Sequence, residues 1–200
     1  MSYSQNGEEA AILEYFACRA TPGRFIDVGA YTGVELSNTR ALAELGWTGV
    51  FVEPSPHAMA ALQRNYAGRT GYDFICAALA LHAGPILLHD CPDALSTTEP
   101  ENVAKWAAAG TRFTPIWTHA ITWEWLLNRF AGPFDFVNID TEGTSMDLFF
   151  SFPVQAARPS VICVEHDGEA NAKAMRSFTR TLGYSEIYFD GNNVLFGLDK

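Results

Sequence analysis

Two kinds of segment alternate along the chain: short apolar runs, and longer stretches with hydrophobic residues at helical spacing. The apolar runs are continuous and rich in β-branched and aromatic residues, which predicts strands that are covered on both faces. These runs lie at residues 24–29, 49–53, 72–77, 134–140 and 160–166. The helical stretches lie at residues 8–19, 37–45, 57–66, 122–130, 145–151 and 170–182. The alternation predicts an α/β fold with helices on both faces of a mostly parallel sheet.

The end of the chain departs from this alternation. Two apolar runs at residues 184–189 and 194–198 are joined by Asp190-Gly-Asn-Asn193, a sequence typical of a hairpin turn. We therefore expect five parallel strands followed by an antiparallel hairpin. Pro85 to His89 is a candidate for a further edge strand.

Residues 91–117 show neither a clear period nor a repeat. A polar segment with aromatic residues, inserted between strands, is where an α/β enzyme often builds a substrate lid. An ordinary surface loop with a short helix near Val103 to Ala109 explains the segment equally well. With 200 residues in total, the chain predicts a single domain over residues 1–200 that includes this insertion.

The charge of the chain narrows the choice of ligand. A formal net charge of -10 argues against a broad basic track for DNA or RNA and favours a neutral or cationic small molecule. No run approaches the ~20 apolar residues that span a bilayer, and residues 1–10 lack the features of a signal peptide. These observations predict a cytoplasmic protein that binds neither nucleic acid nor membrane.

The first apolar run leads into Asp27-Val-Gly-Ala-Tyr-Thr-Gly33, after which helical spacing begins. Gly29 and Gly33 permit positive φ and a close approach of a ligand, and Asp27 can accept a hydrogen bond from a ligand amine. A dinucleotide turn would carry glycine where Tyr31 stands, so the pattern disfavours a pyrophosphate. A purely structural strand-to-helix turn is the alternative.

A second acid lies about twenty residues further on, in Val52-Glu-Pro-Ser-Pro56 at the end of the next run. An acid in the position of Glu53 reaches the ribose hydroxyls of an adenosine. Alternatively, Glu53 is an acid favoured by the dipole of the following helix. The spacing from Asp27 to Glu53 strengthens the nucleoside interpretation.

Several motifs together are similar to those of the FkbM family of S-adenosylmethionine-dependent methyltransferases, in the same order along nearly the whole chain. They are residues 4–9 (SQNGEE), 25–33 (FIDVGAYTG), 36–39 (LSNT), 46–50 (GWTGV), 52–55 (VEPS), 138–143 (NIDTEG) and 164–166 (VEH). The resemblance implies a Rossmann-like class I methyltransferase fold, with a seven-stranded, mostly parallel sheet that ends in the antiparallel hairpin. It also implies S-adenosyl-L-methionine as cofactor.

The resemblance further implies a set of cofactor-binding residues. Gln5 approaches the cofactor from the N-terminal segment, the turn after the first strand holds the methionine end, Glu53 binds the ribose, and Ala77 lies near the adenine. The full expected set is Gln5, Asp27, Gly29, Ala30, Gly33, Glu53, Pro54, Ala77 and Asp140. Tyr31, Thr32 and Thr141 depart from residues common in the family, which affects the acceptor more than the cofactor.

Acidic residues and a histidine follow the fourth and fifth strands, at the edge where ligands bind in such sheets. We name His166, Asp140 and Glu142 as candidate catalytic residues, with His166 or Asp140 as the general base for a hydroxyl acceptor. A divalent ion held by Asp140, Glu142, Glu165 and His166 is an alternative that we do not predict. A structural network of caps is a further alternative for His166.

The resulting hypothesis is O-methylation of a hydroxyl on a sugar or secondary metabolite. The alternatives are an NAD(P)-dependent oxidoreductase with a Rossmann fold, and a non-catalytic nucleoside-binding domain. Trp117, Trp123 and Trp125 are candidates for stacking on the acceptor, although packing is the commoner use of tryptophan.

Overall fold

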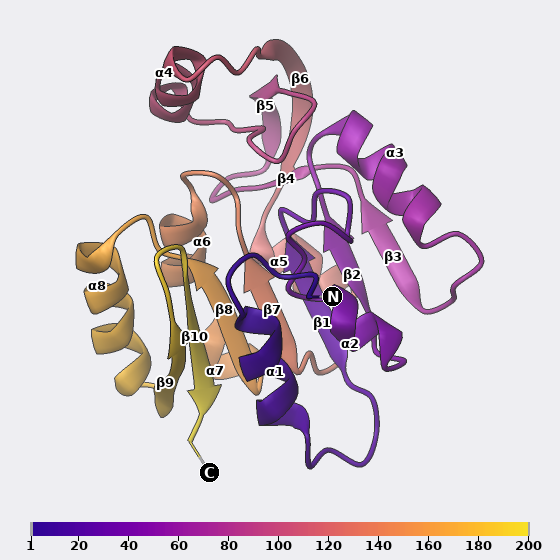
Figure 1. The fold of residues 1–200 in the computed structure, drawn as a ribbon, viewed down its shortest axis with the longest axis vertical. Coiled ribbons are helices and arrows are strands. Elements are labelled where there is room, and N and C mark those ends of the chain that lie inside the picture. Colours follow the sequence, from indigo (N-terminus) through magenta and orange to yellow (C-terminus); the bar gives the residue numbers. More distant parts are fainter. Residues whose placement is uncertain (1, 200) are drawn as a thin grey trace.

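A computed structural model describes residues 2–199, and its centre is a seven-stranded sheet (Figure 1). The strand order is β3-β2-β1-β7-β8-β10-β9, in which the first five strands run parallel and β10 is antiparallel to both neighbours. The predicted sheet and its terminal hairpin are therefore confirmed. The strands are β1 (Arg24–Val28), β2 (Thr48–Val52), β3 (Tyr72–Ile75), β7 (Phe136–Ile139), β8 (Val161–Glu165), β9 (Tyr184–Phe189) and β10 (Asn193–Leu198).

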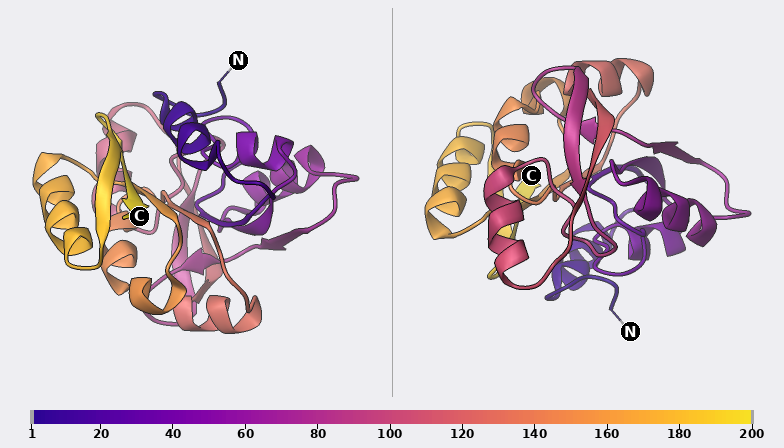
Figure 2. Two further views of the ribbon diagram at one scale, coloured as in Figure 1. Left: turned by 90° about the horizontal axis from the view of Figure 1, so that it is seen from below. Right: turned by 90° about the horizontal axis from the view of Figure 1, so that it is seen from above.

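Helices cover both faces of the sheet, as Figure 2 shows from below and above. The helices are α1 (Glu8–Phe16), α2 (Arg40–Glu44), α3 (Pro56–Asn65), α5 (Trp123–Arg129), α6 (Ser145–Ser151), α7 (Val154–Ala157) and α8 (Glu169–Arg180). One core joins the sheet to α1, α2 and α3, and a second core joins it to the helices of the second half. Burial on both faces explains why the strands are hydrophobic throughout.

Residues 78–121 build a smaller unit beyond the carboxyl ends of the main strands, at the top of Figure 1. It contains β4 (Ala78–Leu79), β5 (Gly84–Asp90), α4 (Pro100–Ala108) and β6 (Thr114–Ile121), with the three strands in the order β4-β6-β5. The expected edge strand at Pro85 to His89 is present as part of β5, which lies at the edge of the smaller sheet. This strand belongs to the smaller sheet, because β5 pairs along its whole length with β6.

The segment that lacked a clear period, residues 91–117, is more ordered than its sequence suggests. It contains α4 and the first half of β6, and the helix starts at Pro100, three residues before the short helix that we considered. No residue of α4 is fully buried. A helix that buries no side chain in the core needs few apolar residues, which explains the unclear period of the segment.

Two other helices are shorter than their sequence predicts. The first ends at Phe16 rather than Arg19, and the second begins at Arg40 rather than Ser37. The hydroxyl of Ser37 accepts the backbone N–H of Arg40, so that the residues before α2 form a turn instead of helix. In the described part of the chain, every helix is too short or too polar to cross a bilayer.

Candidate active site

A cavity of about 480 Å³ lies between the carboxyl ends of the parallel strands and the smaller unit. Its wall comes from the turn after β1, the end of β2, the segments after β7 and β8, residues 93–98, and the start of β10. This edge is where open α/β sheets bind ligands. The volume suits a ligand of nucleoside size.

Gly29 is required by the close approach of two strand ends. Its φ is 78°, and a Cβ atom there would overlap the backbone carbonyl oxygen of Asp140. Gly33, with φ 67°, instead packs against Leu62 and Tyr66 and does not line the cavity. The first glycine therefore shapes the cavity wall, whereas the second shapes the turn behind it.

Glu53 ends β2 with its carboxylate at the cavity wall and is only 5% exposed. It accepts the backbone N–H of Tyr31 and of Ser55, each at 2.8 Å. Burial raises its pKa to about 7 despite these two hydrogen bonds. A ligand hydroxyl that donates to Glu53 would favour its charged form.

Asp27 is buried at the end of β1 and is held by two donors. Thr39 donates its hydroxyl at 2.5 Å, and Asn138 donates its amide at 2.9 Å. Asn138 in turn accepts the amide N–H of Asn38 at 3.0 Å. Burial raises the pKa of Asp27, and the hydrogen bonds of Thr39 and Asn138 oppose that rise. Asp27 therefore orients other polar side chains as well as lining the cavity.

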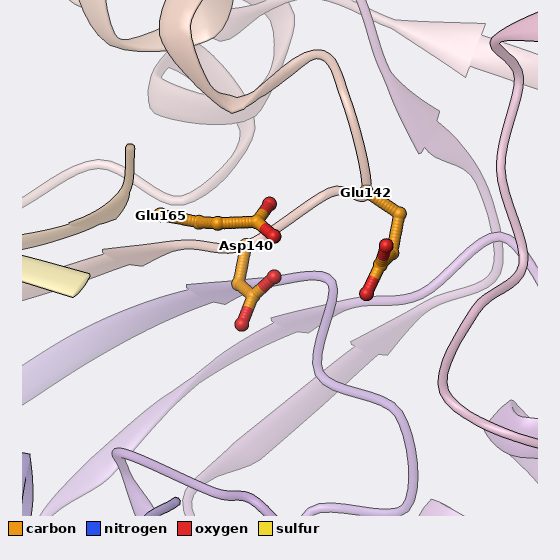
Figure 3. Close-up of side chains that lie close together, drawn as sticks. All are labelled: Asp140, Glu142 and Glu165. Carbon is orange, nitrogen blue, oxygen red and sulfur yellow. The ribbon is translucent and has the colours of Figure 1, made fainter. Parts of the chain in front are cut away.

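Asp140, Glu142 and Glu165 form a carboxylate trio, drawn in Figure 3. One oxygen from each lies within 4.8 Å of the others. Burial and mutual repulsion raise the pKa of Asp140 well above its usual value and that of Glu142 to about 7. Burial and mutual repulsion therefore oppose full ionisation of the trio.

The backbone at Glu142 is tied to the smaller unit. Its φ is 50°, in the left-handed region, and its carbonyl oxygen accepts from Thr97 Oγ1 at 2.7 Å and Asn102 Nδ2 at 2.6 Å. These two bonds hold residues 97–102 over the trio. The wall residues Lys105 and Trp106 come from the same unit.

Comparison with known protein families identifies the family of this chain. The family model described as the methyltransferase FkbM domain matches residues 27–186. The chain belongs to the FkbM methyltransferase family. The recognition made from the motifs is thus confirmed, and no curated protein matches the chain.

Solved structures similar to this FkbM methyltransferase share its fold. A Geobacter metallireducens precorrin-6y C5,15-methyltransferase has a TM-score of 0.52 at 13% identity, over 96% of this chain and 87% of that one. An SAH-bound Podospora anserina methyltransferase also has a TM-score of 0.52 at 12% identity, over 98% and 80%. The human methyltransferase 10 domain containing protein gives 0.52 at 9% identity, over 96% and 81%. These likenesses confirm the class I methyltransferase fold.

Family and fold imply that this FkbM methyltransferase uses S-adenosylmethionine. The residues of the cavity fit that cofactor, because Glu53 offers a buried carboxylate to ribose hydroxyls and the turn after β1 leaves backbone exposed to the cavity. Of the expected set, the residues that line the cavity are Gln5, Asp27, Gly29, Ala30, Glu53, Pro54 and Asp140. Gly33 and Ala77 do not, and Ala78 takes the place of Ala77 in the wall.

His166 lies outside the cavity wall of the FkbM methyltransferase. It is 2% exposed and stacks on Phe189, Nδ1 accepts the backbone N–H of Gly168 at 3.0 Å, and Nε2 lies 3.0 Å from the carbonyl oxygen of Asp190. Both nitrogens are thus engaged in the neutral ring. This arrangement matches the structural network considered from the sequence and leaves no nitrogen for a base.

The carboxylate trio replaces the four-residue cation site considered from the sequence, since His166 is not part of it. Three carboxylate oxygens at this spacing are also suitable ligands for a hard divalent cation. The absence of a metal from the predicted site therefore stays a prediction.

The three tryptophans named from the sequence do not line the cavity. Trp123 is buried and donates its indole N–H to the carbonyl oxygen of Leu148 at 2.9 Å, whereas Trp117 is 73% exposed. The cavity uses Trp106 of α4 instead. Sequence analysis missed it because residues 91–117 gave no pattern that indicated which side chains turn inward.

Proposed function

We propose that this FkbM methyltransferase methylates a hydroxyl group on a small sugar or secondary metabolite. S-Adenosylmethionine supplies a methyl group that is bonded to a positively charged sulfur. When the acceptor oxygen attacks the methyl carbon, the carbon–sulfur bond breaks and the sulfur leaves as a neutral thioether. A hydroxyl acceptor must lose its proton as the new bond forms. A proton-accepting side chain beside the methyl group is therefore needed.

The observation that carries the proposal is the position of Glu142. Its carboxyl lines the cavity next to Asp140 and Glu165, under the unit that contributes Lys105 and Trp106. A pKa of about 7 allows the carboxylate to take a proton at neutral pH and to release it afterwards. We assign Glu142 as the general base, and its own burial together with repulsion from Glu165 and Asp167 keeps its pKa high.

The charge of the cavity supports a neutral or cationic acceptor. Among the described residues its wall carries eight carboxyl groups and a single basic side chain, Lys105. The carboxyl groups belong to Asp27, Glu35, Glu53, Asp93, Asp140, Glu142, Glu165 and Asp167. Such a wall repels phosphates and other anions, which supports a small molecule rather than a nucleic acid as the partner.

Two alternative functions were considered from the sequence, and the family membership bears on only one of them. Membership of a methyltransferase family does not support an NAD(P)-dependent oxidoreductase. A non-catalytic nucleoside-binding domain would bind the cofactor product without needing a group of raised pKa at Glu142. The experiments below separate that alternative from the proposed enzyme.

Cofactor binding is tested by calorimetry with S-adenosylmethionine, S-adenosylhomocysteine and NADH. We expect micromolar binding of the first two, weakened by ~1 to 3 kcal/mol in Glu53→Ala, which is the scale of a hydrogen bond to a charged group. Glu35→Ala is a matched control, because Glu35 also lines the cavity but is exposed. Binding of NADH alone would contradict the proposal.

The acceptor is tested with labelled S-adenosylmethionine and a panel of hydroxyl compounds that are cationic, neutral or anionic. We expect transfer to cationic or neutral members, and a rate lower by about 10²-fold or more in Glu142→Gln, the range for loss of a general base. Affinity for S-adenosylhomocysteine should be unchanged in that variant. Methylation confined to amines or to anionic compounds would refute the assignment.

A further inference from the structure

Two buried amide oxygens in the cavity wall lack a hydrogen-bond donor. They are Asn38 Oδ1 and Asn193 Oδ1, on side chains of residues that are only 4% and 3% exposed. An acceptor left unpaired away from water costs ~1 to 3 kcal/mol. Such groups in a folded protein call for an explanation, and a ligand that brings a donor is one.

The orientation of Asn38 follows from Asp27. Asp27 accepts at both oxygens, from Thr39 and from Asn138, so the NH₂ group of Asn138 must face Asp27. The oxygen of Asn138 is then the group that receives the N–H of Asn38. This chain of bonds leaves the oxygen, and not the nitrogen, of Asn38 unpaired.

Asn193 is oriented in the same way by a second buried carboxylate, Glu8. One oxygen of Glu8 accepts the backbone N–H groups of Asn6 and Gly7 at 2.8 and 3.0 Å, and the other accepts Asn193 Nδ2 at 2.7 Å. Because Glu8 acts as acceptor on both sides, the NH₂ group of Asn193 faces it. The oxygen of Asn193 is thus the unpaired atom here too.

Both carboxamides lie beside Cys163 on the same face of the sheet. Asn38 Nδ2 is 3.5 Å from Cys163 Sγ. Cys163 pairs with Leu195 across β8 and β10, which makes Asn193 its diagonal neighbour, at ~7 to 8 Å between backbones. Asn38 and Asn193 are therefore both neighbours of Cys163 in the wall of one cavity.

The electric field at this place selects the kind of donor. Burial raises the pKa of the Cys163 thiol, and the carboxylates of Glu8, Asp140 and Asp27 raise it further. The basic side chain of the cavity wall, Lys105, belongs to α4 in the smaller unit. A negative field with unpaired acceptors favours a cationic donor over a neutral one.

We propose that Asn38 and Asn193 bind the protonated amino group of the methionine part of the cofactor. This inference rests on the proposed use of S-adenosylmethionine. Asn38 bonds to Asn138 of β7, two strand spacings from Glu53 of β2, and Asn193 begins β10, four spacings away. At about 4.8 Å per spacing, a ligand atom between the two carboxamides lies roughly 14 Å from Glu53. That span suits an extended nucleoside joined to an amino acid, with the ribose at Glu53 and the ammonium at the two carboxamides.

The test compares two ligands that share the thioadenosine part. S-Adenosylhomocysteine carries the amino acid, and 5′-methylthioadenosine lacks it. We expect Asn38→Leu and Asn193→Leu each to weaken S-adenosylhomocysteine about tenfold or more by calorimetry, as for loss of a hydrogen bond to a charged group. Affinity for 5′-methylthioadenosine should change by less than about twofold, which also shows that the variants fold.

Asn128→Leu is the matched control, since Asn128 is an exposed asparagine of α5 outside the cavity wall. Equal weakening of both ligands, or unchanged binding of S-adenosylhomocysteine, would overturn the assignment of the ammonium subsite. If one leucine variant does not fold, the two ligands are compared in the other variant. If neither folds, Asn38→Ser and Asn193→Ser replace them, with the same expected result. Failure of the unaltered protein to bind either ligand would instead refute the proposed cofactor.

Discussion

At the scale of single residues, the cavity depends on backbone positions as much as on charged side chains. Gly29 permits the turn after β1 to pass directly over the carbonyl oxygen of Asp140, and the two strand ends can then share one ligand. Asp27 and Glu8 are acceptors that orient neighbouring amides. The polar groups at these strand ends are therefore fixed before a ligand arrives, which reduces the cost of ordering them on binding.

Gly29→Ala tests the close approach. We expect the free energy of unfolding to fall by at least ~3 kcal/mol, because the new methyl group overlaps the Asp140 carbonyl and the backbone has positive φ. Gly68→Ala is the control, because its φ is 80° but nothing lies within 4 Å, and it should lose only ~1 to 2 kcal/mol. Equal losses in urea titrations of the two variants would show that the approach of the strands is unimportant.

His166→Ala distinguishes a structural role from a catalytic one. Loss of a buried ring with two hydrogen bonds should lower the free energy of unfolding by about 2 to 4 kcal/mol. Affinity for S-adenosylhomocysteine should stay within about twofold, because the ring lies outside the cavity wall. A variant of unchanged stability that has lost only methyl transfer would restore the general-base role.

At the scale of elements, the small unit formed by β4, β5, α4 and β6 is attached to the main sheet at the edge that carries the cavity. Thr97 and Asn102 both donate to the carbonyl oxygen of Glu142, and Tyr31 donates its hydroxyl to the carbonyl oxygen of Pro92 at 3.4 Å. The predicted role of residues 91–117 as a substrate lid stays a prediction. The hydrogen bonds to the carbonyl oxygen of Glu142 would hold such a lid in place over the carboxylate trio.

The double variant Thr97→Val, Asn102→Leu tests this mechanism by hydrogen exchange. We expect amides of residues 91–110 to exchange about tenfold faster, the effect of losing roughly 1.4 kcal/mol of local stability. Exchange in β1 and β7 should not change. Thr111→Val is the control, because Thr111 belongs to the same segment but makes no bond to Glu142. Unchanged exchange in the double variant would mean that other contacts hold the segment.

At the scale of the whole molecule, negative charge concentrates in the cavity. The chain carries a net charge of -10, and eight of its carboxyl groups line this one space. Burial and repulsion raise the pKa of Glu53 and of Glu142 from about 4.5 to about 7. The folded protein therefore binds more protons than the unfolded chain between these pH values.

This difference predicts how stability depends on pH. Because the folded-state pKa values are raised, the stabilising effect of protonation is complete below about pH 4.5 and is lost as pH rises through about 7. Urea titrations of the ligand-free protein between pH 5 and 8 should show a fall on the order of 2 kcal/mol or more. Glu142→Gln should make the fall smaller, and stability that rises with pH over this window would contradict the raised pKa values.

The sequence by itself determined the sheet and much of the cavity wall. Continuous apolar runs predicted the five parallel strands, because both faces of each strand are buried, and Asp190-Gly-Asn-Asn193 predicted the hairpin. The motifs around Asp27 and Glu53 indicated residues that line the cavity, since these motifs depend on turns that are local in the chain. Residues that follow parallel strands meet at one edge, so Asp140 and Glu142 could be assigned there as well.

Only the tertiary structure decided how the individual side chains act. His166 turns away from the cavity toward Phe189 because the carbonyl of Asp190, from the hairpin, lies beside its ring. Trp106 enters the wall. Asn193 is oriented by Glu8, 185 residues away in the chain, and Asn38 is oriented by Asp27 through Asn138, which is 100 residues from Asn38. Such choices depend on hydrogen bonds between segments far apart in the chain. The spacing of residues in the sequence does not predict these partners. It indicates which face of a helix or strand a residue occupies, but not which distant side chain it contacts there.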